Sequence, residues 1–193
     1  MKYVEFKFFE TAFKYKTNEE IKQIINKSPK KKNLLLFFFS IKGNTEIVRY
    51  LVEQHGANVN TKGNFGDNIL FSACTQGNLE LVKYLIENGA KIDAADTDGE
   101  TVLIDACENG NLELVKYLVE EKKMDVNAKD KYGHTVLLFT CQYGNIDIVK
   151  YLVEHGADVN AKFDDGQTLL LWAKKYSFDK EIIDYLISVG AKE

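Results

Sequence analysis

The sequence has little proline and no long apolar segment. One proline occurs among its 193 residues, and the longest uninterrupted apolar run is the six residues from Leu34 to Phe39. A helix that crosses a membrane needs about 20 predominantly apolar residues, so we expect no contact with a membrane. The first 13 residues mix lysine and glutamate with apolar residues, which differs from the continuous apolar core of a secretory signal. We therefore expect a cytoplasmic protein.

Excess positive charge and clustered cysteines are also missing. The formal net charge is −4, which gives no general attraction to nucleic acid. The cysteines Cys74, Cys107 and Cys141 are 33 and 34 residues apart. If they hold the same place on successive helices of a stack, about 8–10 Å apart, their Cα atoms exceed the limit of about 7 Å for a disulfide. We expect free, buried thiols, which fit a reducing compartment.

Signatures of catalysis and of cofactor binding are absent. The sequence has no phosphate-binding glycine loop, no dinucleotide-binding glycine pattern, no His-Glu-x-x-His and no Gly-x-Ser-x-Gly. The spacing of His55, His134 and His155 does not supply the ligands of a metal site. We expect no enzyme, with no catalytic residue, no cofactor and no metal. A large cavity lined by clustered ionisable residues would favour an enzyme instead.

A nine-residue segment recurs through the chain. It reads Gly-Asn-Thr-Glu-Ile-Val-Arg-Tyr-Leu from Gly43, returns in closely similar form at Gly77, Gly110 and Gly144, and has a divergent fifth copy that ends at Leu186. The last leucines of the five copies are 34, 33, 34 and 34 residues apart. A fixed period of this length indicates a stack of similar structural units.

Each unit has the same predicted organisation. A turn glycine is followed by an apolar helix, a Gly-Asn break, a second helix and a polar hairpin. In the second helix of the second copy of the repeat, one apolar stripe is formed by Leu81, Val82, Leu85 and Ile86. Asn78 can cap the start of this helix.

The Gly-Asn-x-Glu-Leu-Val helix start, together with the Gly-Ala-Asp-Val-Asn segment at residues 156–160, resembles the ankyrin repeat family. The resemblance implies an all-α repeat solenoid of helix-turn-helix units joined by β-hairpin-like loops. It implies a single domain at 1–193, with a helical cap at 1–28 and repeats at about 29–62, 63–95, 96–129, 130–162 and 163–193. In the third repeat Lys123 stands where other copies have glycine, so we expect that helix end to be strained or to fray.

The resemblance also implies that partners are bound at the hairpin tips and the exposed side of the inner helices. The copies differ most at these positions, and several carry acidic or aromatic side chains. Aromatic residues are frequent interface hot spots, and rim charges mainly set rate and specificity. The predicted partner-binding residues are Phe65, Asp67, Asp98, Glu100, Glu108, Lys131, Tyr132, His134, Tyr143, Asp165 and Tyr176. The alternative is that these are ordinary surface residues.

The sequence therefore predicts a non-enzymatic protein–protein interaction module or scaffold, whose partner is another protein with a basic face. The alternative function is a dedicated inhibitor or host-directed effector that blocks a target enzyme. We expect a monomer, with homo-oligomerisation through the last repeat as the alternative, because no polar capping repeat follows it.

Four local features need an interpretation. Phe37, Phe38 and Phe39 suit the core of the first inner helix better than a lipid contact. The lysines at positions 27 and 30–32 suit a solvated loop better than a localisation or nucleic-acid signal. Trp172 suits the core of the last repeat, and His134, just after Gly133, suits a surface turn.

Overall fold

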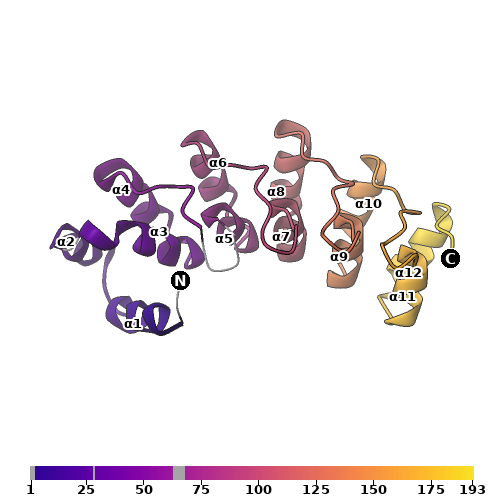
Figure 1. Ribbon diagram of the computed structural model, residues 1–193, viewed down its shortest axis with the longest axis horizontal. Coiled ribbons are helices and arrows are strands. Elements are labelled where there is room, and N and C mark those ends of the chain that lie inside the picture. Colours follow the sequence, from indigo (N-terminus) through magenta and orange to yellow (C-terminus); the bar gives the residue numbers. More distant parts are fainter. Residues whose placement is uncertain (1–2, 28, 63–67) are drawn as a thin grey trace. The chain divides into compact units, whose positions relative to one another are not determined.

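The computed structural model describes residues 3–27, 29–62 and 68–193, and within these ranges the chain forms helices joined by turns (Figure 1). Pairing between extended segments in these ranges is limited to isolated antiparallel bridges, which join Lys62 to Asn68, Lys129 to Thr135 and Lys162 to Thr168. The chain divides into two compact units, one ending at Thr97 and the other beginning at Asp98.

The first unit is a stack of helix pairs. Its elements are α1 (Tyr3–Phe13), α2 (Asn18–Lys27), a 3₁₀ turn η1 (Pro29–Lys31), α3 (Lys32–Ile41), α4 (Thr45–His55), α5 (Ile69–Thr75) and α6 (Leu79–Glu87). The helices α3 and α5 are the inner helices of their repeats, and α4 and α6 are the outer ones. Each inner helix packs against its own outer helix, and α3 also packs against α5.

The second unit continues the same pattern. Its elements are α7 (Val102–Asn109), α8 (Leu112–Lys116), a π-helical turn η2 (Tyr117–Glu121), α9 (Val136–Tyr143), α10 (Ile146–Glu154), α11 (Leu169–Lys175) and α12 (Lys180–Ser188). The inner helices α7, α9 and α11 pack in that order, and so do the outer helices α8, α10 and α12. The predicted all-α repeat stack is confirmed in each unit, whereas the single domain and the repeat boundaries stay predictions.

Side-chain caps begin the outer helices, as the repeated Gly-Asn predicts. The side chains of Asn44, Asn78, Asn111 and Asn145 each accept a hydrogen bond of 3.0–3.2 Å from the backbone N–H three residues later. In the divergent fifth copy, the Asp179 carboxylate accepts one from the N–H two residues later. Each cap contributes about 1 kcal/mol to helix stability.

The N-terminal helical pair is present as α1 and α2. The α1 helix packs on α3 through aromatic rings, with centroid distances of 5.1 Å from Phe6 to Phe38 and 5.6 Å from Phe9 to Phe38. Phe37, Phe38 and Phe39 are buried. Core packing of these three residues is therefore confirmed over a lipid contact.

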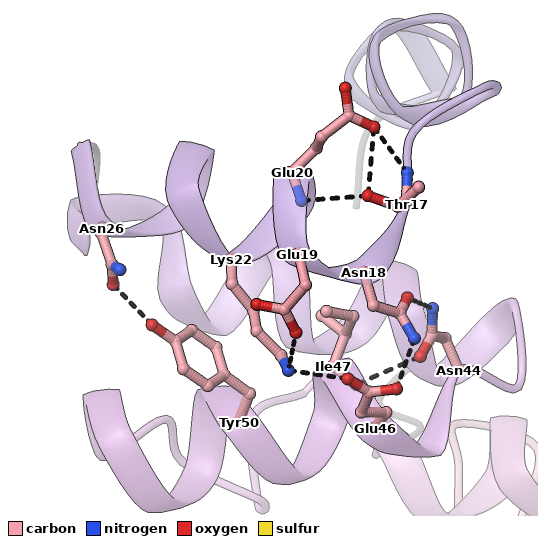
Figure 2. Close-up of polar contacts among 10 residues, drawn as sticks. All are labelled: Thr17, Asn18, Glu19, Glu20, Lys22, Asn26, Asn44, Glu46, Ile47 and Tyr50. Carbon is pink, nitrogen blue, oxygen red and sulfur yellow. Dashed lines mark hydrogen bonds and ion pairs between the residues drawn. The ribbon is translucent and has the colours of Figure 1, made fainter.

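Polar side chains tie α2 to α4 (Figure 2). Lys22 Nζ lies 2.7 Å from Glu46 Oε1, and Asn18 Nδ2 donates to Glu46 Oε2 at 2.6 Å. Asn44 Nδ2 donates to Asn18 Oδ1 at 2.9 Å. The pKa of Glu46 is lowered by its hydrogen bonds to Lys22 and Asn18. These contacts connect the start of α2 to the start of α4.

The third outer helix ends differently from the others. The α8 helix stops at Lys116 and continues as the π turn η2. Lys123 follows with a φ of 57°, in the left-handed region that Gly56, Gly89 and Gly156 occupy in other copies. A residue with a Cβ atom is disfavoured there by about 1–2 kcal/mol. The expected strain at this helix end is confirmed.

Lys123→Gly is expected to raise the free energy of unfolding by about 0.5–1 kcal/mol, because relief of the left-handed strain exceeds the added flexibility of glycine. Chemical denaturation measures the change. Lys122→Gly is the matched control, since Lys122 has an ordinary φ of −94° and glycine there adds only flexibility. Equal losses of stability in both variants would contradict the assignment of strain to Lys123.

The three cysteines are buried and form no disulfide, as predicted. Burial raises the pKa of the Cys107 and Cys141 thiols to about 12. In the unfolded chain a thiol has a pKa of about 8.5. The folded protein therefore keeps two protons that the unfolded chain loses at moderately alkaline pH.

Stability is accordingly expected to fall as the pH rises. The contribution of the thiols is fully present below about pH 8 and declines from about pH 8.5 upward, because only the unfolded state releases its protons there. Urea unfolding midpoints at pH 7, 9 and 10 measure the decline. The double variant Cys107→Ala/Cys141→Ala should show a shallower dependence on pH, and an unchanged slope would contradict this explanation.

Candidate functional site

The hairpin tips of the second unit are linked from one repeat to the next. The backbone N–H of Lys131 donates to the Asp98 carbonyl at 2.9 Å, and the N–H of Asp164 donates to the Tyr132 carbonyl at 3.1 Å. Gly133 lies at this close approach, where a Cβ atom would be 2.8 Å from the Asp164 nitrogen and φ is 78°. The tips thus form one continuous row of turn residues.

A buried carboxylate shapes the middle tip. Asp130 Oδ1 accepts hydrogen bonds of 2.8 Å from the backbone N–H groups of Tyr132 and His134. Its Oδ2 lies 3.1 Å from His134 Nδ1, which donates to it because a carboxylate only accepts. The Asp130 side chain is 2% exposed. This residue therefore fixes both the turn and the orientation of the His134 ring.

Aromatic side chains gather beside the last two tips. The His134 ring lies near Phe163 and Trp172, with centroid distances of 5.1 and 5.2 Å. Trp172 meets Tyr176 at 4.9 Å, and Tyr132 meets His134 at 5.7 Å. Tyr132 and Tyr176 are each 53% exposed. The cluster thus exposes the Tyr132 and Tyr176 rings to solvent, next to the packed rings of His134, Phe163 and Trp172.

Carboxylates surround the tyrosine at the end of α9. The pKa of the Tyr143 phenol is raised to about 12, mainly by burial and next by the negative charges of Glu108 and Glu100. A hydrogen bond to Glu108 and the charge of Asp105 act in the same direction. Tyr143 is 43% exposed. Tyr143 therefore combines an accessible aromatic ring with a negative electrostatic potential from the nearby carboxylates.

Phe139 joins the acidic and aromatic groups. It lies four residues before Tyr143, on the same side of α9, and its ring is 6.1 Å from the His134 ring. The two groups together are called the aromatic–acidic face. It consists of Glu100, Asp105, Glu108, Tyr132, His134, Phe139, Tyr143, Phe163, Trp172 and Tyr176.

Six of the predicted partner-binding residues lie on this face: Glu100, Glu108, Tyr132, His134, Tyr143 and Tyr176. Lys131 Nζ is ion-paired with the Asp98 carboxylate, so these two predicted residues offset each other's charge. Asp165 accepts a hydrogen bond from the Gln167 N–H at 2.9 Å and shapes its own turn. Phe65 and Asp67 lie outside the described residues.

Two expectations about aromatic residues need correction. His134 is not an open surface residue, because its contacts with Asp130 and neighbouring rings leave the side chain 19% exposed. Trp172 is not fully in the core but half-buried within the aromatic–acidic face. Both lie where the last two tips meet the inner helices.

Sequence reasoning missed Asp130, Phe139 and Phe163. A signal for Phe163 was present, because it lies three residues before a turn glycine, where Asp96 and Asp130 stand in the preceding repeats. An apolar residue in an otherwise polar hairpin requires a buried environment, and Trp172 and His134 supply it.

The first unit contains a separate cavity of about 820 Å³. Its ionisable lining includes four lysines and Glu10, which is the kind of feature that would favour an enzyme. Among the described residues, the lining has no cysteine, serine or histidine, and the pKa of Glu10 is lowered, mainly by its hydrogen bond to Lys42. A carboxylate with a lowered pKa is a poor general base at neutral pH. The described part of the lining therefore pairs no cysteine, serine or histidine with a general base.

In the described ranges, 3–27, 29–62 and 68–193, no group of three or more His, Cys, Asp or Glu side chains is placed to hold a metal ion. None of the helices in those ranges has the length and apolar character needed to cross a membrane.

Models of ankyrin repeats match most of the chain. A three-copy ankyrin repeat model matches residues 9–96, 40–130 and 92–163, and a many-copy ankyrin repeat model matches residues 140–187. The serine/threonine-protein kinase TNNI3K of Mus musculus is 36% identical over 55 residues, which are 28% of this chain and 7% of that protein. Alpha-latrocrustotoxin-Lt1a of Latrodectus tredecimguttatus is 39% identical over 59 residues, 31% of this chain and 4% of that protein. The chain thus matches a small part of each relative's length.

Proposed function

Because the chain belongs to the ankyrin repeat family, we propose that it is a non-enzymatic module that binds a partner protein through the aromatic–acidic face. Ankyrin repeats generally mediate protein–protein interaction. The observation that carries the proposal is the exposure of Tyr132, Tyr143 and Tyr176 on one face of the second unit. Large aromatic rings that lose water on binding are the commonest interface hot spots.

The charges of this face favour a basic partner. Three carboxylates lie near Tyr143, those of Glu100, Asp105 and Glu108. The positive charge of Lys131, on a nearby tip, is offset by its ion pair with Asp98. A Lys or Arg side chain of the partner would lie against the carboxylates, and its alkyl part or an adjacent apolar residue would cover the tyrosine rings. We infer a partner with a basic surface next to an apolar anchor.

The double variant Tyr132→Ala/Tyr143→Ala is expected to reduce partner capture at least tenfold, because it removes two exposed rings from the face. Affinity capture from the cell of origin, quantified by mass spectrometry, identifies the proteins whose recovery falls. Stability should change little, since both rings are substantially exposed. Tyr185→Ala on the outer helix α12 is the matched control.

Unchanged capture by the double variant, or an equal loss with Tyr185→Ala, would contradict this site. Charge is tested separately with Glu100→Gln/Glu108→Gln, which should weaken capture most at low ionic strength. Once a partner is known, its activity in the complex distinguishes a scaffold from an inhibitor. We also expect the cytoplasm as the location, because Cys74, Cys107 and Cys141 are buried thiols that form no disulfide.

A further inference from the structure

The cavity of the first unit lies where the N-terminal helical pair meets the first repeat. Its volume is about 820 Å³, within the range of about 300–1,000 Å³ that is typical of ligand pockets. The residues that line it are Lys7, Glu10, Thr11, Phe13, Lys14, Tyr15, Lys16, Asn18, Ile21, Phe38, Phe39, Lys42 and Asn44. They come from α1, the loop after it, the start of α2, the end of α3 and the turn between α3 and α4.

The base of the cavity is apolar. Phe38, Phe39 and Ile21 are buried, and the Phe13 ring packs against Phe39 and Phe38 with centroid distances of 5.2 and 6.1 Å. Binding of an aliphatic or aromatic side chain on this surface is favourable, because it removes apolar area from contact with water.

The wall formed by α2 and α4 is held in place by the contacts in Figure 2. Asn18 and Asn44, which both line the cavity, are hydrogen-bonded to each other at 2.9 Å. Asn18 is also bonded to Glu46 at 2.6 Å, and Glu46 is ion-paired with Lys22. A ligand would therefore meet a wall that is ordered before binding, which lowers the entropy cost of binding.

The rim of the cavity is positively charged, although the chain as a whole has a net charge of −4. Lys42 Nζ lies 2.6 Å from Glu10 Oε1. Lys7 and Lys14 are near enough to Glu10 to lower its pKa further. Among the described residues, none is close enough to form an ion pair with Lys7, Lys14 or Lys16. Lys16 instead lies near Glu20 and contributes to the lowered pKa of that residue. The lining thus holds four lysines and one carboxylate, and the rim can accept further negative charge.

We propose that this cavity binds an acidic segment of a partner protein, with a bulky apolar side chain in the cavity and Asp or Glu carboxylates against the lysines. The lysines are spread along the rim, since Lys7, Lys14 and Lys42 lie near Glu10 of α1 whereas Lys16 lies near Glu20 of α2. This distribution suits several carboxylates along a peptide better than the single head group of a fatty acid. The site is separate from the aromatic–acidic face and does not depend on the function proposed for that face.

The test uses the purified 193-residue chain and fluorescein-labelled synthetic peptides. The probe has the sequence Gly-Asp-Glu-Leu-Phe-Glu-Asp-Gly, and two control peptides replace either all its acids by Asn and Gln or its Leu-Phe by Ala-Ala. Fluorescence anisotropy at low salt should show binding of the probe and at least tenfold weaker binding of both controls. Raising the salt should weaken the binding of the probe, because the lysines are exposed to solvent.

Protein variants locate the binding site. Lys7→Glu/Lys14→Glu should weaken probe binding at least tenfold, whereas Lys91→Glu, an exposed lysine outside the cavity, should change it less than twofold. Thr11→Trp should also abolish binding, because Thr11 is exposed and lines the cavity. Circular dichroism melting curves establish that each variant is folded.

Three results would overturn the proposal. The first is equal binding of the uncharged peptide, and the second is unchanged binding to folded Lys7→Glu/Lys14→Glu or folded Thr11→Trp. The third is binding of dodecanoate in this cavity without binding of the probe, which would assign the cavity to an amphipathic small molecule.

Discussion

Leu152→Ala is expected to lower the free energy of unfolding by about 3–5 kcal/mol, which is among the largest effects of a single truncation. Leu152 is the last residue of the recurring nine-residue segment in the fourth repeat and is fully buried in α10. Truncation removes transfer free energy and leaves a cavity, because the neighbouring outer helices α8 and α12 hold their positions. Chemical denaturation of the purified protein measures the loss.

Leu171→Ala is the control for this prediction. Leu171 is a leucine of the same size on α11, and 39% of it is exposed, so its truncation should cost about 1 kcal/mol or less. Similar losses in the two variants would mean that the recurring segment is not the scaffold of the stack.

Asp130→Ala is expected to destabilise the second unit by about 2–3 kcal/mol, since hydrogen bonds to a charged group contribute about 1.5–3 kcal/mol and their loss leaves donors unpaired. The variant loses an acceptor for the N–H groups of Tyr132 and His134 and for His134 Nδ1. The tip should loosen, and partner capture should fall although the carboxylate itself is not offered to the partner. Denaturation and capture are measured on the same preparation.

Asp165→Ala is the matched control, because Asp165 is an exposed tip carboxylate that bonds mainly within its own turn. Its loss should cost about 1 kcal/mol or less. Asp130→Asn should lie between the wild type and Asp130→Ala, since the amide oxygen retains part of the accepting capacity. A loss for Asp130→Ala no larger than for Asp165→Ala would contradict the role assigned to the buried carboxylate.

The scaffold could be predicted because it depends on local rules repeated in register. The asparagine caps and the buried last leucine of each copy follow from one repeat considered alone. The strain at Lys123 follows from comparison with the copies that have glycine at that position. Six of the residues predicted to bind a partner lie together on the aromatic–acidic face, at positions where the copies differ, and their role in binding stays a prediction.

The internal structure of the site could not be predicted, because it depends on contacts between repeats. Phe163 and Trp172 enclose the His134 ring from positions about 30 and 40 residues away, and Asp130 sets the direction of that ring. The cavity of the first unit was missed for a related reason. The first 28 residues diverge from the repeat, so no periodic pattern indicates how α1 meets α3.

The most direct test of the central claim is site-specific photo-crosslinking of the partner in cells. A photoreactive phenylalanine analogue replaces Tyr132, Tyr176 or, as the control on the outer helix, Tyr185. The account predicts that Tyr132 and Tyr176 yield crosslinks to the same partner protein and that Tyr185 yields none. Crosslinks from Tyr185 alone, or equally from all three positions, would contradict the assignment of partner binding to the aromatic–acidic face.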